Sequence, residues 1–138
     1  MFPLTSKDGL RFDLTASGLP FYCGRAILRQ EIYLPEPSQK VVFELGNLRA
    51  AVAHVRLNGL PCGSLAWQPF RLDVTGQVRQ GKNSLELELV NTLRNLLGPH
   101  HLAGGEQDYT GPGEYRDRMR WTDDVILAPF GFGWARFI

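Results

Sequence analysis

The amino-acid sequence predicts an all-β chain folded as a β-sandwich, and three observations support this fold class. Apolar and polar residues alternate in most segments, as they do in a strand that has one buried face. Asn, Gly and Pro separate these segments at the short intervals that are typical of a sandwich. No window of helical length shows an apolar period of 3.6 residues. We therefore expect roughly eight short strands.

The segment 84–91 alternates throughout, and two further segments also place apolar residues at every second position. Their apolar positions are predicted to face the core: Val41, Phe43 and Leu45; Ala51, Ala53, Val55 and Leu57; and Leu85, Leu87 and Leu89. Further segments are predicted to be extended, namely residues 10–14, 25–34, 70–74, 123–130 and 133–138.

The turns between these segments have recognisable chemistry. Asn58-Gly59 permits the positive φ of a two-residue hairpin, which would join a strand ending at Leu57 to one around 63–65. Pro35 is expected to end the strand that starts at Arg25. Residues 74–81 are predicted to make at most one helical turn.

The length and composition fit a single domain over residues 1–138. The chain has 138 residues, 43% of them hydrophobic, so it can bury a core without a metal or a disulfide. Cys23 and Cys62 are expected to act as small apolar residues rather than as a disulfide. The lack of any Cys-x-x-Cys pair argues against a zinc site.

Charge and hydropathy argue against several classes of function. The net charge is +1 and the Arg residues are scattered, so no basic face for a nucleic acid is expected. No apolar stretch approaches the roughly 20 residues that span a bilayer, so no membrane partner is expected. The first residues lack a basic region followed by an apolar one, which argues against a signal peptide and leaves the compartment open.

The segment from Gly98 to Arg120 interrupts the strand pattern. It has little apolar patterning and is rich in Gly and charge. A loop of this length inside a compact domain is uncommon and is usually functional, part of an interface or disordered. It is the most informative irregular stretch of the chain.

A spaced set of residues in 55–91 resembles a known family. The set is Asn58-Gly59 after a strand, Gly63, Trp67 before a short strand, Asp73-Val74-Thr75 at its end, and Gly81-Lys82-Asn83 before an alternating strand. This order is similar to the sugar-binding-type jelly-roll domain of family 2-like bacterial glycoside hydrolases, which has the galactose-binding-like fold. Residues 19–35 and 123–138 resemble the opening and closing strands of that domain. Residues 95–101, Asn-Leu-Leu-Gly-Pro-His-His, are similar to C-terminal modules of large bacterial glycosidases, including rhamnosidase-like ones.

The matching residues also have structural explanations. Asp73 and Thr75 can hydrogen-bond to free backbone groups where the chain leaves a strand. Gly81 and Asn83 fit a turn before the last long strand. The pattern therefore favours the fold more strongly than it favours any activity.

Catalytic and metal chemistry receive little support. A glycosidase needs two carboxylates across a cleft, and the available ones are interpreted as solvated loop charges: Glu106, Asp108, Glu114, Asp123 and Asp124. The resemblance implies that the catalytic carboxylates lie in a separate barrel. His100, His101, Glu106 and Asp108 could ligate a metal, but adjacent His side chains on an extended chain point to opposite sides. Galactose-binding-like folds often carry structural calcium, yet the chain has no dense Asp/Asn ladder. No cofactor is expected.

Carbohydrate binding is the remaining chemistry. Sugars offer apolar C–H faces to aromatic rings and hydroxyl groups to planar polar side chains. The residues predicted to contact carbohydrate are Trp67, His100, Tyr109, Tyr115, Arg116 and Trp121, with Arg94 and Arg118 as further polar candidates. For Trp67 and Trp121, packing in the core or at a strand edge is the competing interpretation.

The favoured hypothesis is a non-catalytic accessory domain of a larger glycoside hydrolase. It would pack against the catalytic domain of the same polypeptide and help to shape a carbohydrate site through the segment after Gly98. One alternative is an autonomous carbohydrate-binding module or lectin. The other is a structural or protein-interaction β-sandwich. No constellation of residues supports a self-contained hydrolase.

Overall fold

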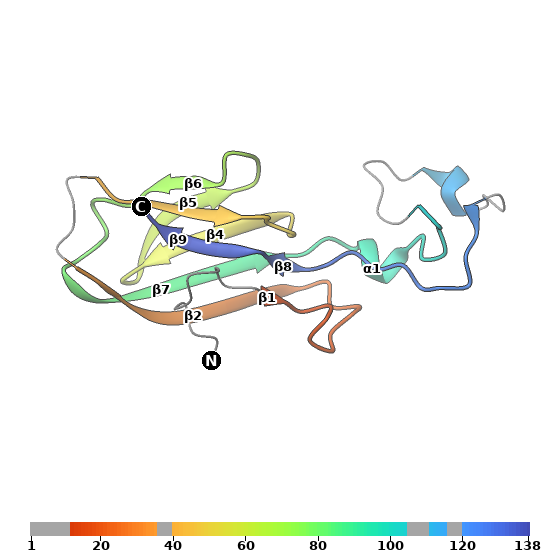
Figure 1. The fold of residues 1–138 in the computed structure, drawn as a ribbon, viewed down its shortest axis with the longest axis horizontal. Coiled ribbons are helices and arrows are strands. Elements are labelled where there is room, and N and C mark those ends of the chain that lie inside the picture. The colour runs from red at the N-terminus through yellow and green to blue at the C-terminus, as the bar shows by residue number, and fades with distance from the viewer. Residues whose placement is uncertain (1–11, 36–39, 105–110, 116–119) are drawn as a thin grey trace.

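The computed structural model describes residues 12–35, 40–104, 111–115 and 120–138. Figure 1 shows a body of strands from which one segment extends. The strands are β1 (Phe12–Asp13), β2 (Arg25–Leu34), β3 (Val42–Gly46), β4 (Val52–Leu57), β5 (Leu60–Leu65), β6 (Arg71–Asp73), β7 (Gly81–Val90), β8 (Gly131–Phe132) and β9 (Trp134–Phe137). The helical elements are α1 (Arg94–Leu97) and the 3-10 turn η1 (Pro112–Tyr115).

The strands form two antiparallel sheets and a short extra pair. The larger sheet has the order β2-β7-β4-β5, and the smaller one has the order β6-β3-β9. β1 pairs with β8, which brings Phe12 opposite Phe132. The prediction of an all-β sandwich is therefore confirmed.

The core lies between the sheets and is built by the alternation seen in the sequence. The predicted inward residues that are buried are Val41, Phe43, Leu45, Ala53, Val55, Leu57, Leu85, Leu87 and Leu89. Ala51 was expected to join them but is exposed, because it precedes β4 and lies in the turn after β3. The strand predicted at 25–34 has the bounds of β2.

The Asn58-Gly59 turn connects β4 to β5 as predicted. Both residues have positive φ, 53° for Asn58 and 81° for Gly59, as a two-residue hairpin requires. The Asn58 amide also donates to Oδ1 of Asn83 at 2.9 Å, and Asn83 is almost fully buried. Two residues of the family-like pattern thus meet in one network that joins the hairpin to the start of β7.

The Asp73–Thr75 segment closes the end of β6. Oδ1 of Asp73 accepts hydrogen bonds from the backbone N–H of Thr75 (3.1 Å) and from its hydroxyl group (2.6 Å). These bonds, the hydroxyl one first, hold the pKa of Asp73 below its ordinary value. Oγ1 of Thr75 in turn accepts from the backbone N–H of Val41 at 3.0 Å. The predicted structural role of this segment is confirmed.

A buried carboxylate that the alternation did not reveal lies on the smaller sheet. Glu44 of β3 is 7% exposed and lies between two arginines of the neighbouring strands. Nε of Arg71 donates to its Oε1 and Nε of Arg136 to its Oε2, both at 2.6 Å. The guanidinium of Arg136 also lies 4.7 Å from the centre of the Trp134 ring. The bond from Arg71, with that from Arg136, lowers the pKa of Glu44 despite its burial.

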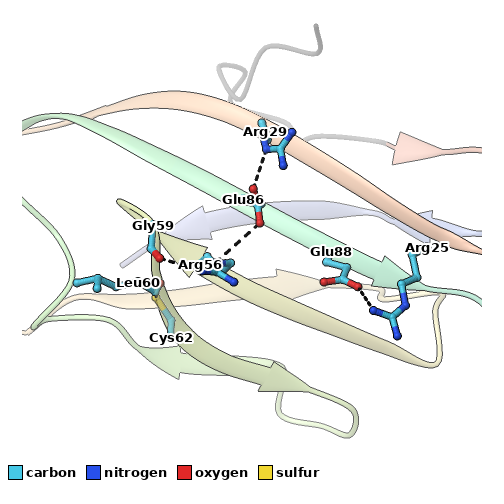
Figure 2. Close-up of polar contacts among 8 residues, drawn as sticks. All are labelled: Arg25, Arg29, Arg56, Gly59, Leu60, Cys62, Glu86 and Glu88. Carbon is cyan, nitrogen blue, oxygen red and sulfur yellow. Dashed lines mark hydrogen bonds and ion pairs between the residues drawn. The ribbon is translucent and has the colours of Figure 1, made fainter.

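The outer face of the larger sheet carries a charged ladder. Figure 2 shows Glu86 of β7 between Arg29 of β2 and Arg56 of β4. The Arg29 contact is 2.7 Å and the Arg56 contact 3.9 Å. Farther along, Arg25 pairs with Glu88 at 2.9 Å. These cross-strand pairs lie on the solvated face of the sheet, and each contributes little to stability.

Residues 91–104, 111–115 and 120–129, here called the arm, leave the sandwich after β7 and return to it before β8. In Figure 1 the arm extends beyond the end of the sheets and carries α1 and η1. Residues 123–130 were predicted to be a strand, but they form the irregular returning side of the arm. Apolar residues such as Val125 suggested a strand, although no strand lies beside them in the described part of the chain. Within the described residues, no helix has the length and apolar character needed to cross a membrane.

Candidate functional site

The base of the arm is held by a buried asparagine, Asn95 of α1. Its Nδ2 donates to the carbonyl oxygens of Pro20 (2.9 Å) and Ala128 (2.8 Å), and its Oδ1 accepts from the N–H of Ala128 at 2.8 Å. Asn95 is 4% exposed, so these bonds form in an environment of low polarity, where an unmade bond would be costly. One side chain thereby joins the outgoing side of the arm, the returning side and the loop before β2.

His100 fixes the turn that follows α1. Its Nε2 lies 2.7 Å from the carbonyl oxygen of Asn95, so Nε2 carries the proton and donates. The ring also makes an edge contact with Phe21, with centroids 6.0 Å apart. Between Asn95 and His100 the chain passes through Gly98, whose φ is 82°, and the peptide bond from Gly98 to Pro99 is cis. The His100 ring is therefore a structural part of the base of the arm.

The two sides of the arm are hydrogen-bonded to each other. The N–H of Ala103 donates to the carbonyl of Arg120 at 2.7 Å, and the N–H of Thr122 donates to the carbonyl of His101 at 2.9 Å. Between these bonds Leu102 pairs with Trp121 in an antiparallel bridge, and Leu102 is 2% exposed. In the described residues, the two sides of the arm are thus joined by a short backbone ladder beside the buried Leu102.

An aromatic pair lies on this ladder. The His101 imidazole stacks on the Trp121 indole with centroids 4.4 Å apart, and Nδ1 of His101 lies 3.0 Å from the carbonyl of Thr122. Nε1 of Trp121 donates to Oδ1 of Asp123 at 3.3 Å. Trp121 nevertheless remains 56% exposed. The pair therefore presents a flat, supported aromatic surface to the outside.

α1 and the residue before it carry exposed apolar side chains. Asn95 points inward, whereas Leu93, Leu96 and Leu97 are 53%, 50% and 62% exposed. Residues at i, i+3 and i+4 share one face of a helix, so these leucines form a continuous surface, here called the leucine face. Monomeric proteins seldom expose clustered large apolar side chains unless they bind something there.

The predicted contact residues fall into three groups. His100, Tyr115 and Trp121 lie in the arm, and the Tyr115 hydroxyl donates to the carbonyl of Gly98 at 3.1 Å, next to His100. Trp67 lies apart from them, in the loop between β5 and β6, and is 80% exposed, which excludes core packing for this side chain. Tyr109 and Arg116 lie outside the described residues, as do Glu106, Asp108, Arg118 and the side chain of Glu114.

Some of the residues considered for metal or catalytic chemistry lie in the described part of the chain. Within that part, no group of three or more His, Cys, Asp or Glu side chains could hold a metal ion. Asp123 and Asp124 are exposed, in agreement with their interpretation as solvated charges. Cys23 and Cys62 are both free and partly exposed.

A small cavity of about 230 Å³ lies where β1 and β8 meet the turn after β3. Its polar lining comes from Asp13, Asn47 and Arg49, and Phe12 and Phe132 supply part of its apolar lining. Oδ1 of Asp13 already accepts a bond from the N–H of Thr15 at 2.9 Å, which gives the carboxylate a structural role. The sequence did not point to this cavity because its walls come from segments far apart in the chain.

Three known proteins are similar to this chain in sequence or in structure. A candidate beta-glucuronidase from Formosa agariphila is 36% identical to the chain over an alignment of 115 residues, which covers 75% of this chain and 9% of the relative. A rhamnosidase from Novosphingobium sp. PP1Y has a matching structure at a TM-score of 0.61 and 25% identity, covering 85% of this chain and 11% of that one. The beta-glucuronidase of Bifidobacterium dentium shares the fold at a TM-score of 0.54 and 18% identity, over 96% and 24% of the two chains.

The chain is similar to a domain-sized part of larger glycoside hydrolases. It spans only 9% to 24% of the length of these three proteins. No family model matches it. The predicted relation to glycoside hydrolases is therefore confirmed at this coarse level.

Proposed function

We propose that this chain is a non-catalytic accessory domain of a larger glycoside hydrolase, with a jelly roll of the galactose-binding-like type. It packs against the catalytic domain of the same polypeptide and uses the arm as its main contact. The observation that carries the proposal is the arm itself, which extends beyond the sheets (Figure 1) and carries the exposed leucine face on α1. The small share of each relative that the chain covers supports the same interpretation.

The hydrogen bonds within the arm suit its proposed role as a contact element. Asn95 fixes its base and the backbone bonds between residues 101–103 and 120–122 fix its length. A contact element that is ordered before binding loses little conformational entropy when it binds. The domain can therefore hold a neighbouring domain at a defined distance and angle from the sandwich.

Hydrogen–deuterium exchange tests the proposal. The 138-residue chain is compared with the full-length natural polypeptide that contains it. The amides of residues 93–98 are expected to exchange at least tenfold more slowly in the long polypeptide, because the leucine face is then covered. The amides of the Asn58-Gly59 hairpin provide the control and should exchange at the same rate in both. Equal exchange of α1 in the two proteins would contradict the proposal.

Carbohydrate binding by the arm is a second candidate function. It is favoured by the Trp121 indole, which is 56% exposed and is supported from behind by His101. Such a surface is suited to stacking against the apolar face of a sugar ring. The carbohydrate would then be held at the outer part of the arm, beside the partner domain rather than on the sheets.

Tryptophan fluorescence tests whether the arm binds carbohydrate in addition to its proposed packing role. The chain is titrated with glucuronic acid, rhamnose, mannose and oligosaccharides that contain them. A saturable change that Trp121→Ala abolishes and Trp67→Ala retains is the expected result. Loss of the change in Trp67→Ala alone would move the site to the loop between β5 and β6. No saturable change with any sugar would remove this candidate and leave the packing role intact.

A further inference from the structure

The cavity where β1 and β8 meet the turn after β3 has a polar lining that the arm does not use. Asp13 of β1 and two residues of the turn, Asn47 and Arg49, supply this lining. The backbone fixes the turn against β8, because the N–H of Arg49 donates to the carbonyl of Gly131 at 2.8 Å and the N–H of Gly131 donates back at 2.9 Å. The walls of the cavity are therefore held in place by the sheet structure itself.

The two carboxylate oxygens of Asp13 have different surroundings. Oδ1 accepts hydrogen bonds from the N–H of Thr15 at 2.9 Å and from those of Ala16 and Phe130, both at 3.3 Å. Oδ2 has no hydrogen-bond partner among the described residues. The bonds to Oδ1 orient the carboxylate in advance, so Oδ2 can accept a bond from a ligand at little cost in side-chain entropy.

Three backbone positions around the cavity are unsuited to ordinary side chains. Asn47 has a φ of 55°, in the left-handed region that few residues other than glycine adopt. A Cβ on Gly131 would lie 1.8 Å from the carbonyl oxygen of Phe12, and a Cβ on Gly133 would lie 2.9 Å from Cβ of Asn47. Left-handed and closely packed backbone of this kind is enriched at ligand sites. All three positions line this one cavity.

The lining indicates which class of ligand would fit. Asp13 and Arg49 carry opposite charges, which favours a ligand without a net charge. A carboxylate accepts hydrogen bonds and the amide of Asn47 both donates and accepts them, and a hydroxyl group can meet either requirement. Pro129 and Phe132 add apolar surface. The volume of about 230 Å³ is below the roughly 300–1,000 Å³ of pockets that take drug-sized ligands. A small, neutral ligand with several hydroxyl groups matches all of these properties.

We propose that this cavity binds one neutral monosaccharide unit, with Oδ2 of Asp13 and the side-chain amide of Asn47 contacting its hydroxyl groups. Hydrogen bonds from hydroxyl groups to a carboxylate are stronger than those between neutral groups, so Asp13 supplies the main polar contact. The site lies on the sandwich, apart from Trp121 in the arm, and does not depend on the packing role of the arm.

A site-resolved NMR titration tests the proposal. The 138-residue chain, labelled with ¹⁵N, is titrated separately with D-mannose, L-rhamnose, D-glucose and D-glucuronate. At least one neutral sugar is expected to cause saturable shifts of the backbone amides of Gly131 and Gly133 and of the side-chain amide of Asn47. D-glucuronate, which carries a charge, should bind more weakly than that sugar. The amides of Ala103 and Thr122 report on the arm and should not shift with the same midpoint.

Two variants remove the proposed contacts while keeping the local structure. Asp13→Asn retains an oxygen for the backbone bonds and replaces the other oxygen by an amide nitrogen. Asn47→Gly removes the side-chain amide at a φ that glycine adopts readily. Each variant is expected to raise the Kd of the neutral sugar at least about tenfold. Asp73→Asn is the matched control, because Oδ1 of Asp73 also accepts from a backbone N–H but Asp73 does not line the cavity, and its Kd should equal that of wild type.

The outcomes decide between this site and its alternatives. If sugars shift only the amides of the arm, the second candidate function stands and the cavity site is wrong. Binding to the cavity by glycerol or mannitol with the same Kd as the sugars would overturn the assignment to a monosaccharide, as would tighter binding of D-glucuronate. Shifts that appear with Ca²⁺ and with no sugar would identify a cation site instead. If Asp13→Asn lowers the Tm, Asn47→Gly decides alone, and an unchanged Kd in that variant would overturn the proposal. None of these results alters the exchange test of the leucine face.

Discussion

The ring centroids of the His101 imidazole and the Trp121 indole lie 4.4 Å apart, and the two ring planes are inclined by 19°. The pair joins the outgoing and returning sides of the arm at the point where Leu102 bridges to Trp121. Trp121→Ala is expected to weaken the local stability of the arm by about 1 kcal/mol or more, because it removes both the stacking and its buried area. Hydrogen exchange at the amides of Ala103 and Thr122 should accelerate accordingly.

A histidine of the sheet provides the control for this prediction. His54→Ala removes a ring that contacts Ser64 on the outer face of the larger sheet, at 2.7 Å. It should leave exchange in the arm unchanged. Equal exchange in wild type and Trp121→Ala would show that the backbone bonds alone hold the arm together.

Asn95→Ala is expected to be among the most damaging substitutions in the arm. It removes the bonds to Pro20 and Ala128 and leaves buried backbone groups unsatisfied. The expected loss is about 2–3 kcal/mol of unfolding free energy, measured by urea denaturation. Gln68→Ala, at an exposed position between β5 and β6, should change stability by less than about 0.5 kcal/mol. If Asn95→Ala accelerates hydrogen exchange in the arm but leaves the unfolding free energy unchanged, the arm unfolds independently of the sandwich.

Glu44 is expected to make stability depend on pH at the acidic end. Its pKa in the folded protein is lowered from the ordinary value of 4.5, first by the bond from Arg71 and also by that from Arg136. A group with a depressed folded pKa stabilises the protein above its unfolded pKa, and this stabilisation is lost as pH falls through the folded value. Unfolding free energy should therefore decrease from about pH 4.5 downward.

Glu44→Gln tests this assignment. The variant should be less stable than wild type at pH 7 and should show a flatter acid limb in denaturant titrations between pH 7 and pH 3. An unchanged slope would assign the acid sensitivity to other carboxylates, of which Asp73 is the first candidate.

Gly131 and Gly76 are expected to respond very differently to alanine. A Cβ on Gly131 would lie 1.8 Å from the carbonyl oxygen of Phe12, so Gly131→Ala should break the β1–β8 pair. The expected loss is about 2–4 kcal/mol. A Cβ on Gly76 meets no atom within 4 Å, and Gly76→Ala should change stability by at most about 0.5 kcal/mol. Thermal unfolding of both variants checks the contrast, and similar Tm values would disprove it.

The sheets could be predicted because their residues follow a local rule. Leu85, Leu87 and Leu89 alternate with polar neighbours, and the strand at 25–34 ends before a proline. Glu44 escaped prediction because its burial depends on arginines 27 and 92 residues away in sequence. Alternation alone identifies the faces of a strand but does not show which outward face is covered by long side chains.

The arm could be located from the sequence but not constructed from it. Its unusual composition marked residues 98–120 as irregular, yet the bonds of Asn95 reach 75 residues back to Pro20 and 33 residues forward to Ala128. No local pattern encodes such a choice of partner. The strand predicted around Val125 was wrong because period and composition do not show whether a neighbouring strand exists.

The pairing of β1 with β8, and of β3 with β9, has a consequence for how this chain folds during synthesis. Phe12 cannot meet its partner until Phe132 has been made, and Phe43 must wait for Phe137. Until then β3 has β6 on one side only, and its other edge is open to any extended chain nearby. Pairings so distant in sequence form late and slowly. A ribosome that stalls within the arm would therefore display an incomplete sheet, and this nascent intermediate is the form of the protein most exposed to misassembly.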